Sequence, residues 1–396
     1  MFRLKFCLQG AFIILKFLIY RIRIPFLKNV IIIGGGISGL LTAIQLTSAL
    51  IPTIVIEKKN YPFHRVCGEY ISNETVPFLR SLDLFPENLN PPFIRRFQLS
   101  SMNGKNQILP LDLGGFGISR YTFDNLLYER AKMLGATFLL NEEVEKCSFD
   151  HERFKLTTTS TQLEADVVVG AFGKRSKMDM HLQRNFINKR SPYVGVKYHI
   201  KTDHSNDLIA LHNFKGGYCG ISNVEGDKTN LCYLTHRDNI RQHKSIREME
   251  EAIMFKNPLL KSIFKNSQFL FNKPETINEI SFETKLPVEN HILMTGDAAG
   301  MITPLCGNGM AMAMHSSKIL SELIIDEFAK TNFNREILEK KYVMKWNALF
   351  RRRLWFGRQV QKLFGNEWAS NLTVNLAINV RPLAQLIIKG THGKPF

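Results

Sequence analysis

The segment VIIIGGGISGLLTAIQL, residues 30–46, constrains the fold of this chain more than any other. Four apolar β-forming residues lead into a glycine turn, and the turn leads into an apolar helix. Gly34, Gly36 and Gly39 have the spacing G-x-G-x-x-G. In this spacing the first glycine permits a tight turn, the second lets backbone approach a pyrophosphate, and the third lets the helix pack against the strand. We therefore expect a doubly wound α/β domain in which the helix N-terminus faces the phosphates of a dinucleotide.

A second apolar strand, TIVIEKK at residues 53–59, ends in a carboxylate. Glu57 follows Gly39 by 18 residues, where an acid can bind the two hydroxyl groups of a ribose. Lys58, the next residue, is predicted to belong to the same site. The ordered series of strand, turn, helix, strand and acid favours a nucleotide site over a glycine turn without a ligand.

A second glycine turn lies near the other end of the chain, in ILMTGDAAGMITPLCGNGMAMAMHSSKIL at residues 292–320. Asp297 can bind a ribityl hydroxyl, and Gly307, Asn308 and Gly309 let backbone approach a flavin ring. The helix expected from about Met310 would favour negative charge on the reduced ring. NAD and FAD can both use the first turn, but only a longer dinucleotide needs this second anchor. The sequence therefore predicts FAD.

A third segment, ISRYTFDNLLYERAKMLGATFLL at residues 118–140, fits the same cofactor. Arg120 can reach phosphate or ribityl oxygens, and Val144 is expected at a strand edge near the adenine. Arg65 is predicted to contact the cofactor as well. For Asp124, the role of a helix-capping acid is at least as well supported as a role in cofactor binding.

These residues resemble FAD-dependent oxidoreductases of the geranylgeranyl reductase family, within the para-hydroxybenzoate hydroxylase-like flavoprotein group. The resemblance covers residues 28–326 and rests on GGGISG, PFHRVCGEYIS, SRYTFDNLL, ADVVVGAFGKRS and GDAAGMITPLCGNG. It implies a Rossmann-like FAD-binding domain with an inserted, β-rich substrate domain whose antiparallel sheet covers the flavin. It also places the loop of Cys67 near the flavin, so Cys67 is the candidate catalytic residue, although a buried cysteine is more often a small apolar residue.

Two departures from the family pattern bear on the reaction. The group usually carries Gly-Ala-Asp-Gly where this chain has Phe172 in place of the aspartate, and this weakens the case for NAD(P)H as electron donor. The tryptophan-rich motif of flavin halogenases has no counterpart in GGYCGISNVE, residues 216–225, which disfavours halogenation.

Three functions remain open on the sequence. The first is reduction of a carbon–carbon double bond in a prenyl or lipid-like substrate, and RVCGEYIS and the basic, apolar C-terminal part favour it. The second is monooxygenation of an aromatic or polyketide-like substrate. The third is a membrane-associated electron carrier without catalysis of its own. The nucleotide motifs serve all three equally.

The expected organisation has four parts. Residues 1–27 form a basic, apolar extension that is an interfacial anchor, a packing extension or translated sequence ahead of the true start. An FAD-binding domain is expected at 28–190 and 285–330, and a hairpin near 93–115 within this range contributes to the substrate domain. The substrate domain itself is expected at 191–284. A C-terminal helical region is expected at 331–396.

The distribution of charge indicates a binding partner. The net charge of +17 is concentrated at the two ends, and eleven Lys or Arg residues stand against one acid from Lys340 onward. Interleaving with Phe, Leu, Ile and Trp favours a membrane surface over nucleic acid. Six scattered cysteines without metal-ligand spacing predict no metal site and a reducing compartment, so we expect a cytoplasmic protein, peripheral on the inner face of the cytoplasmic membrane if it binds one.

Overall fold

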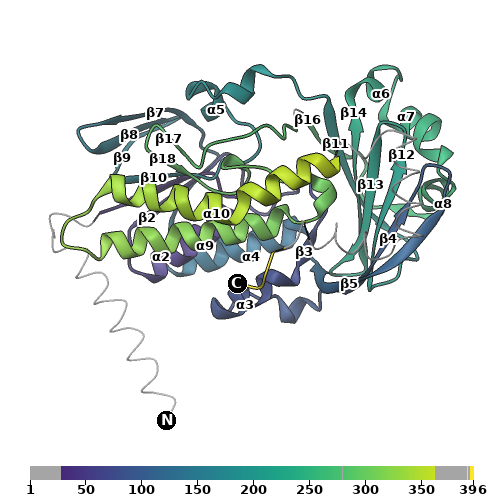
Figure 1. The fold of residues 1–396 in the computed structure, drawn as a ribbon, viewed down its shortest axis with the longest axis horizontal. Coiled ribbons are helices and arrows are strands. Elements are labelled where there is room, and N and C mark those ends of the chain that lie inside the picture. Colours follow the sequence, from purple (N-terminus) through teal and green to yellow (C-terminus); the bar gives the residue numbers. More distant parts are fainter. Residues whose placement is uncertain (1–27, 279, 362–389, 391–392) are drawn as a thin grey trace, which may run out of the picture.

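The computed structural model describes residues 28–278, 280–361, 390 and 393–396. The predicted extension at 1–27 lies outside the described residues. Figure 1 shows two domains side by side. The first is a nucleotide-type domain with long helices, and the second is a large sheet backed by short helices. The α/β fold class predicted from the sequence is confirmed.

The first domain is built on a six-stranded sheet with the order β17-β18-β10-β1-β2-β6. Its strands are β1 (Val30–Ile33), β2 (Thr53–Glu57), β6 (Thr137–Leu140), β10 (Val167–Gly170), β17 (Val288–Glu289) and β18 (Ile292–Met294). All neighbours pair in parallel except β17 and β18. β1 and β10 are buried along their whole length, as expected for strands covered on both faces. The chain order reverses between β1 and β10, and a ligand crevice is expected at the carboxyl ends of these strands.

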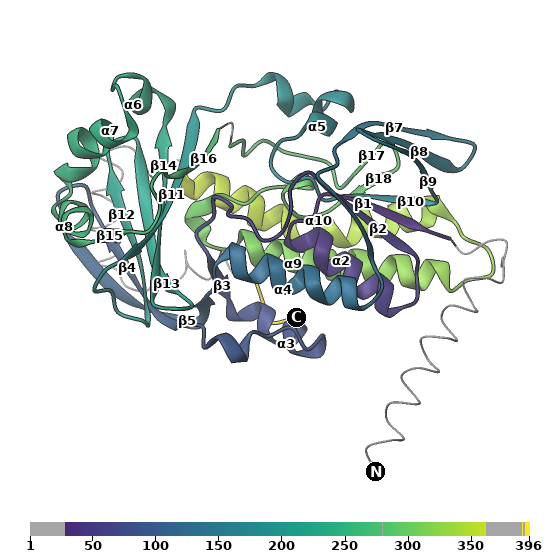
Figure 2. The same cartoon turned by 180° about the vertical axis from the view of Figure 1, so that it is seen from behind.

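Long helices cover one side of this sheet. They are α2 (Ile37–Ser48), α4 (Arg120–Met133) and α9 (Gly309–Phe328), and α10 (Arg335–Gln361) packs on α9. A small sheet of β7 (Val144–Asp150), β8 (Arg153–Thr158) and β9 (Gln162–Ala165) lies on the other side, above the helices in both views (Figures 1 and 2). α2 is buried almost all round because it is enclosed by α4, α9 and the sheet.

The second domain is a nine-stranded sheet with the order β15-β11-β14-β13-β12-β4-β5-β3, and β16 pairs with β11. Its strands are β3 (Tyr70–Ser72), β4 (Phe93–Ser100), β5 (Asn106–Gly117), β11 (Tyr193–Lys201), β12 (Leu208–Phe214), β13 (Gly217–Val224), β14 (Lys228–His236), β15 (Gln268–Phe269) and β16 (Glu275–Asn278). Neighbours are antiparallel except β4 and β12. This is the antiparallel sheet that the resemblance implied.

Short helices complete the fold, and two of them cover the outer face of the large sheet. Apolar side chains from β11, β13 and β14 pack there against α7 (Ile246–Ile253) and α8 (Pro258–Asn266). The inner face turns toward the first domain (Figure 2). The remaining short helices are α3 (Val76–Ser81), α5 (Lys177–His181) and α6 (Arg237–Arg241). No helix within the described ranges combines the length and hydropathy needed to cross a bilayer.

Candidate functional site

A cavity of about 930 Å³ lies between the two sheets. Its walls come from the glycine turn after β1, the loop at 63–70, residues 142–144 and 171–178, the segment 297–313 and the inner face of the large sheet. The parallel strands end at this cavity, which is where the strand order predicts a ligand. Its size falls within the range of cofactor and substrate sites.

The three glycines of the first turn perform distinct roles. Gly34 has a φ of +105°, and a Cβ there would meet the carbonyl oxygen of Ala171 at 2.5 Å. A Cβ on Gly39 would overlap the carbonyl oxygen of Gly34, so this glycine lets α2 pack on β1. Gly36 instead faces open space, with Nη2 of Arg120 the nearest atom at 4.0 Å. That space at a helix N-terminus fits the pyrophosphate of FAD.

A buried charge network supports this turn. Oε2 of Glu57 accepts hydrogen bonds from the backbone N–H of Gly35 at 2.9 Å and from Nη2 of Arg65 at 3.2 Å. Asp124 accepts from Arg65 at 3.0 Å and from both Nε and Nη2 of Arg120 at 2.6 and 2.7 Å. The structure thus brings the predicted residues Glu57, Arg65 and Arg120 together. The interpretation of Asp124 as a capping acid was wrong, because Ser119 is the N-cap of α4.

The other predicted cofactor residues also reach the cavity. Lys58 and Val144 lie on one side of it, and Asp297, Gly307, Asn308 and Gly309 lie on another. Gly307 has a φ of +62°, which an L side chain rarely adopts. Among the predicted cofactor residues Gly39 alone does not line the cavity, since it is committed to packing. Assignment of these side chains to FAD stays a prediction.

The turn that carries Asp297 is held from behind by two buried cations. Nζ of Lys285 donates to the carbonyl oxygens of Lys174 and Asp297, both at 2.8 Å. Arg184 donates to the carbonyl oxygen of Ala298 at 2.9 Å and pairs with Asp179 and Glu289. Burial lowers the pKa of Lys285 to about 8. These contacts fix the backbone on which Asp297 is presented.

A second charge cluster, missed by the sequence analysis, lies in the wall beside Cys67. Glu69 is fully buried, lines the cavity and accepts hydrogen bonds from Nζ of Lys197, from Nε2 of His199 at 2.6 Å and from the backbone N–H of Arg120 at 2.7 Å. Lys197 also donates to the carbonyl oxygen of Arg65 at 3.2 Å. The cluster therefore ties the loop of Cys67 to both β11 and α4.

The electrostatics of this cluster follow from its charges. Burial alone would raise the pKa of Glu69, but Lys197 and then His199 outweigh it, so the pKa lies below its usual value. Burial, assisted by Lys197, lowers the pKa of His64 to about 4. Glu69 is therefore ionised and His64 neutral near pH 7.

Cys67 lies half-buried in the cavity wall, two residues before Glu69 in the same loop. Its carbonyl oxygen accepts a hydrogen bond from Nδ2 of Asn230 at 3.2 Å. Cys232 on β14 also lines the cavity, and burial raises the pKa of its thiol to about 12. The four cysteines whose state the structure describes, at positions 67, 147, 219 and 232, are free thiols.

The large sheet gives the cavity an apolar wall. The lining side chains from its strands are mainly aliphatic and aromatic: Phe97, Leu99, Leu109, Leu111, Ile209, Leu211, Tyr218, Leu234 and Ile277. Strand alternation directs these residues inward, while their neighbours on β12, β13 and β14 pack against α7 and α8. In the described part of the chain no cluster of three or more His, Cys, Asp or Glu residues has a metal-binding arrangement.

Comparisons with known proteins agree with this geometry. Residues 28–329 match the family model described as FAD binding domain. The chain is 23% identical to conditioned medium factor receptor 1 of Dictyostelium discoideum, over 90% of this chain and 71% of the relative. It is 22% identical to the digeranylgeranylglycerophospholipid reductase of Methanococcus vannielii, over 91% of this chain and 95% of that one. The predicted resemblance to this reductase family is confirmed.

Solved structures show the same fold. The flavin-dependent brominase Bmp2 superposes with a TM-score of 0.73 at 17% identity, covering 92% of this chain and 93% of its own. A geranylgeranyl bacteriochlorophyll reductase-like protein from Thermoplasma acidophilum gives a TM-score of 0.72 at 16% identity, covering 91% and 95%. One architecture thus accommodates different reactions, and the lining residues must decide between them.

Proposed function

The chain belongs to the FAD-binding domain family, and on that premise we propose that this FAD-dependent oxidoreductase reduces a carbon–carbon double bond in a prenyl or lipid-like substrate. The observation that carries the proposal is the contrast within one cavity. The glycine turns and charges occupy the side of the first domain, and an aliphatic wall occupies the side of the large sheet. The named activity of the Methanococcus vannielii relative supports the same substrate class.

In this proposal the residues of the first domain hold the cofactor. The N-terminus of α2 and the open space at Gly36 receive the pyrophosphate, and Glu57 accepts hydrogen bonds from the ribose hydroxyls. Asp297 binds the ribityl chain, on backbone fixed by Lys285 and Arg184. Bound FAD would supply hydride transfer to the substrate.

The large sheet would hold the substrate. Apolar side chains from β4, β5 and β12 exclude water and orient an unsaturated chain by packing alone. Reduction of an alkene also needs a proton at the neighbouring carbon. We assign it to Sγ of Cys67, a half-buried residue that lines the cavity. The Glu69 cluster keeps the loop of this thiol in place.

The test uses the purified protein, chemically reduced and incubated with a total lipid extract with and without oxygen. Mass spectrometry should find a product heavier by two hydrogen atoms in the anaerobic sample. A product that gains one oxygen atom, and only in air, would replace the proposal with a monooxygenase. Flavin turnover with a quinone or protein acceptor and no altered small molecule would instead support an electron carrier.

Two further measurements in the same preparation address the residues. Cys67→Ala should lower product formation at least about 100-fold, the lower end of the range for loss of a general acid, while FAD binding is retained. A separate sample with oxidised flavin, mixed with NADH or NADPH, tests a nicotinamide as electron donor. Loss of the oxidised-flavin absorbance would support that donor, against which Phe172 counts in the sequence.

A further inference from the structure

The exposed face of α10 combines basic and large apolar side chains. Lys340, Lys341, Lys345, Arg351 and Arg352 are all exposed, and no Asp or Glu occurs between Lys340 and Gln361. Between these cations lie Met344, with 63% of its surface exposed, and Trp355, with 56%. Lys341, Met344, Ala348, Arg351 and Trp355 follow one another at three or four residues, so they share one face of the helix.

The opposite face of α10 is fixed to the molecule. The hydroxyl of Tyr342 donates to the carbonyl oxygen of Met294 at 2.6 Å, and Trp346, Phe350 and Leu354 are buried. A Cβ on Gly300 would lie 3.0 Å from both Leu354 and Trp346. The exposed face therefore belongs to a rigidly docked helix.

This helix also contacts the wall of the cavity. Oγ1 of Thr303 donates to the carbonyl oxygen of Gly357 at 3.2 Å, and the neighbouring Met301, Ile302, Pro304 and Leu305 line the cavity. One turn further along α10, at its C-terminal end, Gln361 accepts a hydrogen bond from the hydroxyl of Tyr218, another lining residue, at 3.3 Å. Both contacts lie at the C-terminal end of α10. Along the helix axis, Gly357 is therefore about 3 Å from Trp355 and about 26 Å from Lys340.

We propose that the exposed face of α10, from Lys340 to Trp355, docks the protein on an anionic membrane surface. The five cations match anionic headgroups, and an exposed Trp flanked by Arg suits the interface between headgroups and acyl chains. The face is about 24 Å long. The inference rests on the proposed function, because docking through α10 would hold the cavity of a lipid-modifying enzyme close to its substrate.

The first experiment is co-sedimentation of the full chain with phosphatidylcholine vesicles, with or without about one third phosphatidylglycerol. Binding is expected only with the anionic vesicles and should weaken as salt rises. The quadruple variant Lys341→Gln, Lys345→Gln, Arg351→Gln and Arg352→Gln should bind at least about 100-fold more weakly, since each basic residue near such a surface contributes roughly fivefold.

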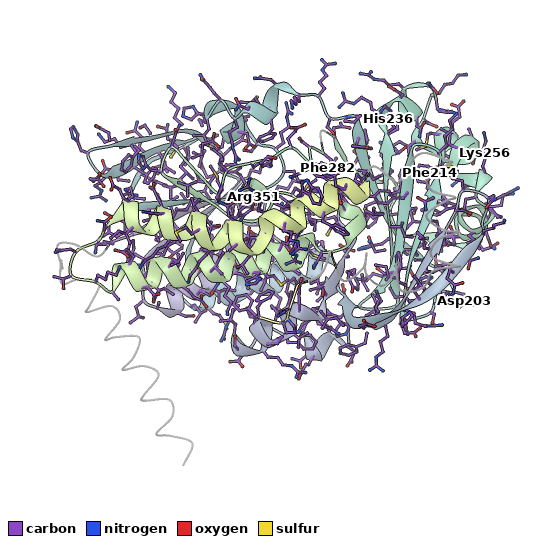
Figure 3. The ribbon with its side chains drawn as sticks, viewed as in Figure 1. Asp203, Phe214, His236, Lys256, Phe282 and Arg351 are labelled. Atoms are coloured by element: carbon purple, nitrogen blue, oxygen red, sulfur yellow. The ribbon has the colours of Figure 1, made fainter. Side chains whose placement is uncertain are left out.

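A matched control makes the same charge change at the far end of the molecule. Lys244, Lys256, Lys261 and Lys265 are exposed around α7 and α8, and Figure 3 shows Lys256 there, well away from Arg351 on α10. Their replacement by Gln should leave most of the binding intact. Equal losses in both variants, unchanged binding of the α10 variant, or no binding of the natural sequence to anionic vesicles would each overturn the proposal.

Trp355 supplies a second measurement. Its fluorescence should shift to shorter wavelength when anionic vesicles are added, and Trp355→Phe should abolish the shift. A shift that persists in this variant would contradict docking through α10. Turnover of detergent-dispersed substrate should be equal in the natural protein and the quadruple variant, so failure of docking and failure of the proposed reaction are distinguishable.

Discussion

Gly36 and Gly39 lie one helical turn apart but meet different physical demands. Gly39→Ala forces a methyl group onto the carbonyl oxygen of Gly34, and we expect it to destabilise the apoprotein by about 1–3 kcal/mol. Gly36→Ala places its methyl group in open space, so apoprotein stability should change little while FAD affinity falls at least about tenfold. Urea denaturation and FAD titration of both variants separate the two effects. Equal loss of stability in both would contradict these roles.

Glu69 is the residue whose removal should cost most near the cavity. Glu69→Gln leaves Lys197 buried without its counter-charge, and we expect a loss of about 3–5 kcal/mol. The pKa of Glu69 is lower in the folded protein than its usual 4.5, so its stabilisation is complete above about pH 5 and is lost as the pH falls below that value. Below pH 4.5 the unfolding free energy of the variant should therefore depend less on pH than that of the natural protein.

Denaturation curves at pH 7 and pH 4 check this expectation. Glu145→Gln, at an exposed carboxylate, is the control and should behave like the natural sequence at both values. If the unfolding free energy of Glu69→Gln falls between pH 7 and pH 4 as much as that of the control, a group other than Glu69 causes the loss of stability in acid.

At this scale the sequence predicted the glycine turn but not the Glu69 cluster. The spacing of the three glycines predicts their roles, because the strand, the turn and the helix follow one another directly in the sequence. Glu69 meets Lys197 and His199 only because β11 lies over the loop of Cys67. The alternation of YVGVKYHIK places Gly195, Lys197 and His199 on one face, but nothing local says that a carboxylate faces them.

The N-terminus of α4 is the element on which the two domains meet. Glu225, in the turn between β13 and β14, accepts hydrogen bonds from the backbone N–H of Ser119 at 2.7 Å, from its hydroxyl at 2.6 Å and from the hydroxyl of Thr122 at 2.7 Å. A carboxylate at a helix N-terminus also opposes the helix dipole. The large sheet thus sets the position of Arg120 in the cofactor site.

Glu225→Gln should therefore affect both stability and cofactor binding. We expect a loss of about 1–3 kcal/mol in unfolding free energy and severalfold weaker FAD binding, since an amide replaces one acceptor by a donor. The control is Glu248→Gln, which changes a carboxylate at the N-terminus of α7, where it accepts from the backbone N–H of Lys244 at 2.8 Å. FAD titration should be unchanged in that variant. Unaltered FAD affinity in Glu225→Gln would disprove the coupling.

The elements near the motifs were the ones that sequence could predict. β1, α2 and β2 occur where the apolar periods and the glycines place them. The hairpin expected near 93–115 is present as the antiparallel pair β4 and β5. The other pairings could not be inferred, because β4 lies parallel to β12 and β3 joins the edge of β5 after a gap of more than thirty residues. Such partners are chosen by packing over long range and leave no local signal.

The molecule as a whole should lose stability in mild acid through buried histidines. His212 is only 2% exposed, contacts Oγ of Ser100 through Nδ1 at 2.8 Å, and has its pKa lowered by burial to about 3. The unfolded chain takes up a proton below about pH 6.5 that the folded protein refuses, so stability falls as the pH drops below that value. This residue alone should contribute roughly 1 kcal/mol per pH unit.

His212→Gln keeps a hydrogen-bonding group at this position but does not titrate. Its unfolding free energy should be less pH-dependent than that of the natural protein between pH 6.5 and pH 5, a window above that of Glu69. Urea denaturation at half-unit intervals measures the slope. Parallel curves for the two proteins would exclude His212 as a source of acid sensitivity.

At the largest scale, the sequence was sufficient for the fold class and the family. The motifs at 34–39 and 296–309 identify the architecture, whereas the reaction depends on which side chains the large sheet directs inward. Leu99 and Leu211 come from strands that are paired in parallel and are more than a hundred residues apart in the chain. The predicted domain limits remain predictions.

The strands whose ends form the cofactor crevice are synthesised at widely separated times. β1 lies in the middle of its sheet, yet its neighbour β10 ends at Gly170, and β18 begins only at Ile292. At roughly 5–20 residues per second on the ribosome, β18 follows β1 by about 13–50 s. For that interval the nascent chain exposes an incomplete apolar sheet edge, and the strand ends that form the cofactor crevice are not all present until β18 has been made.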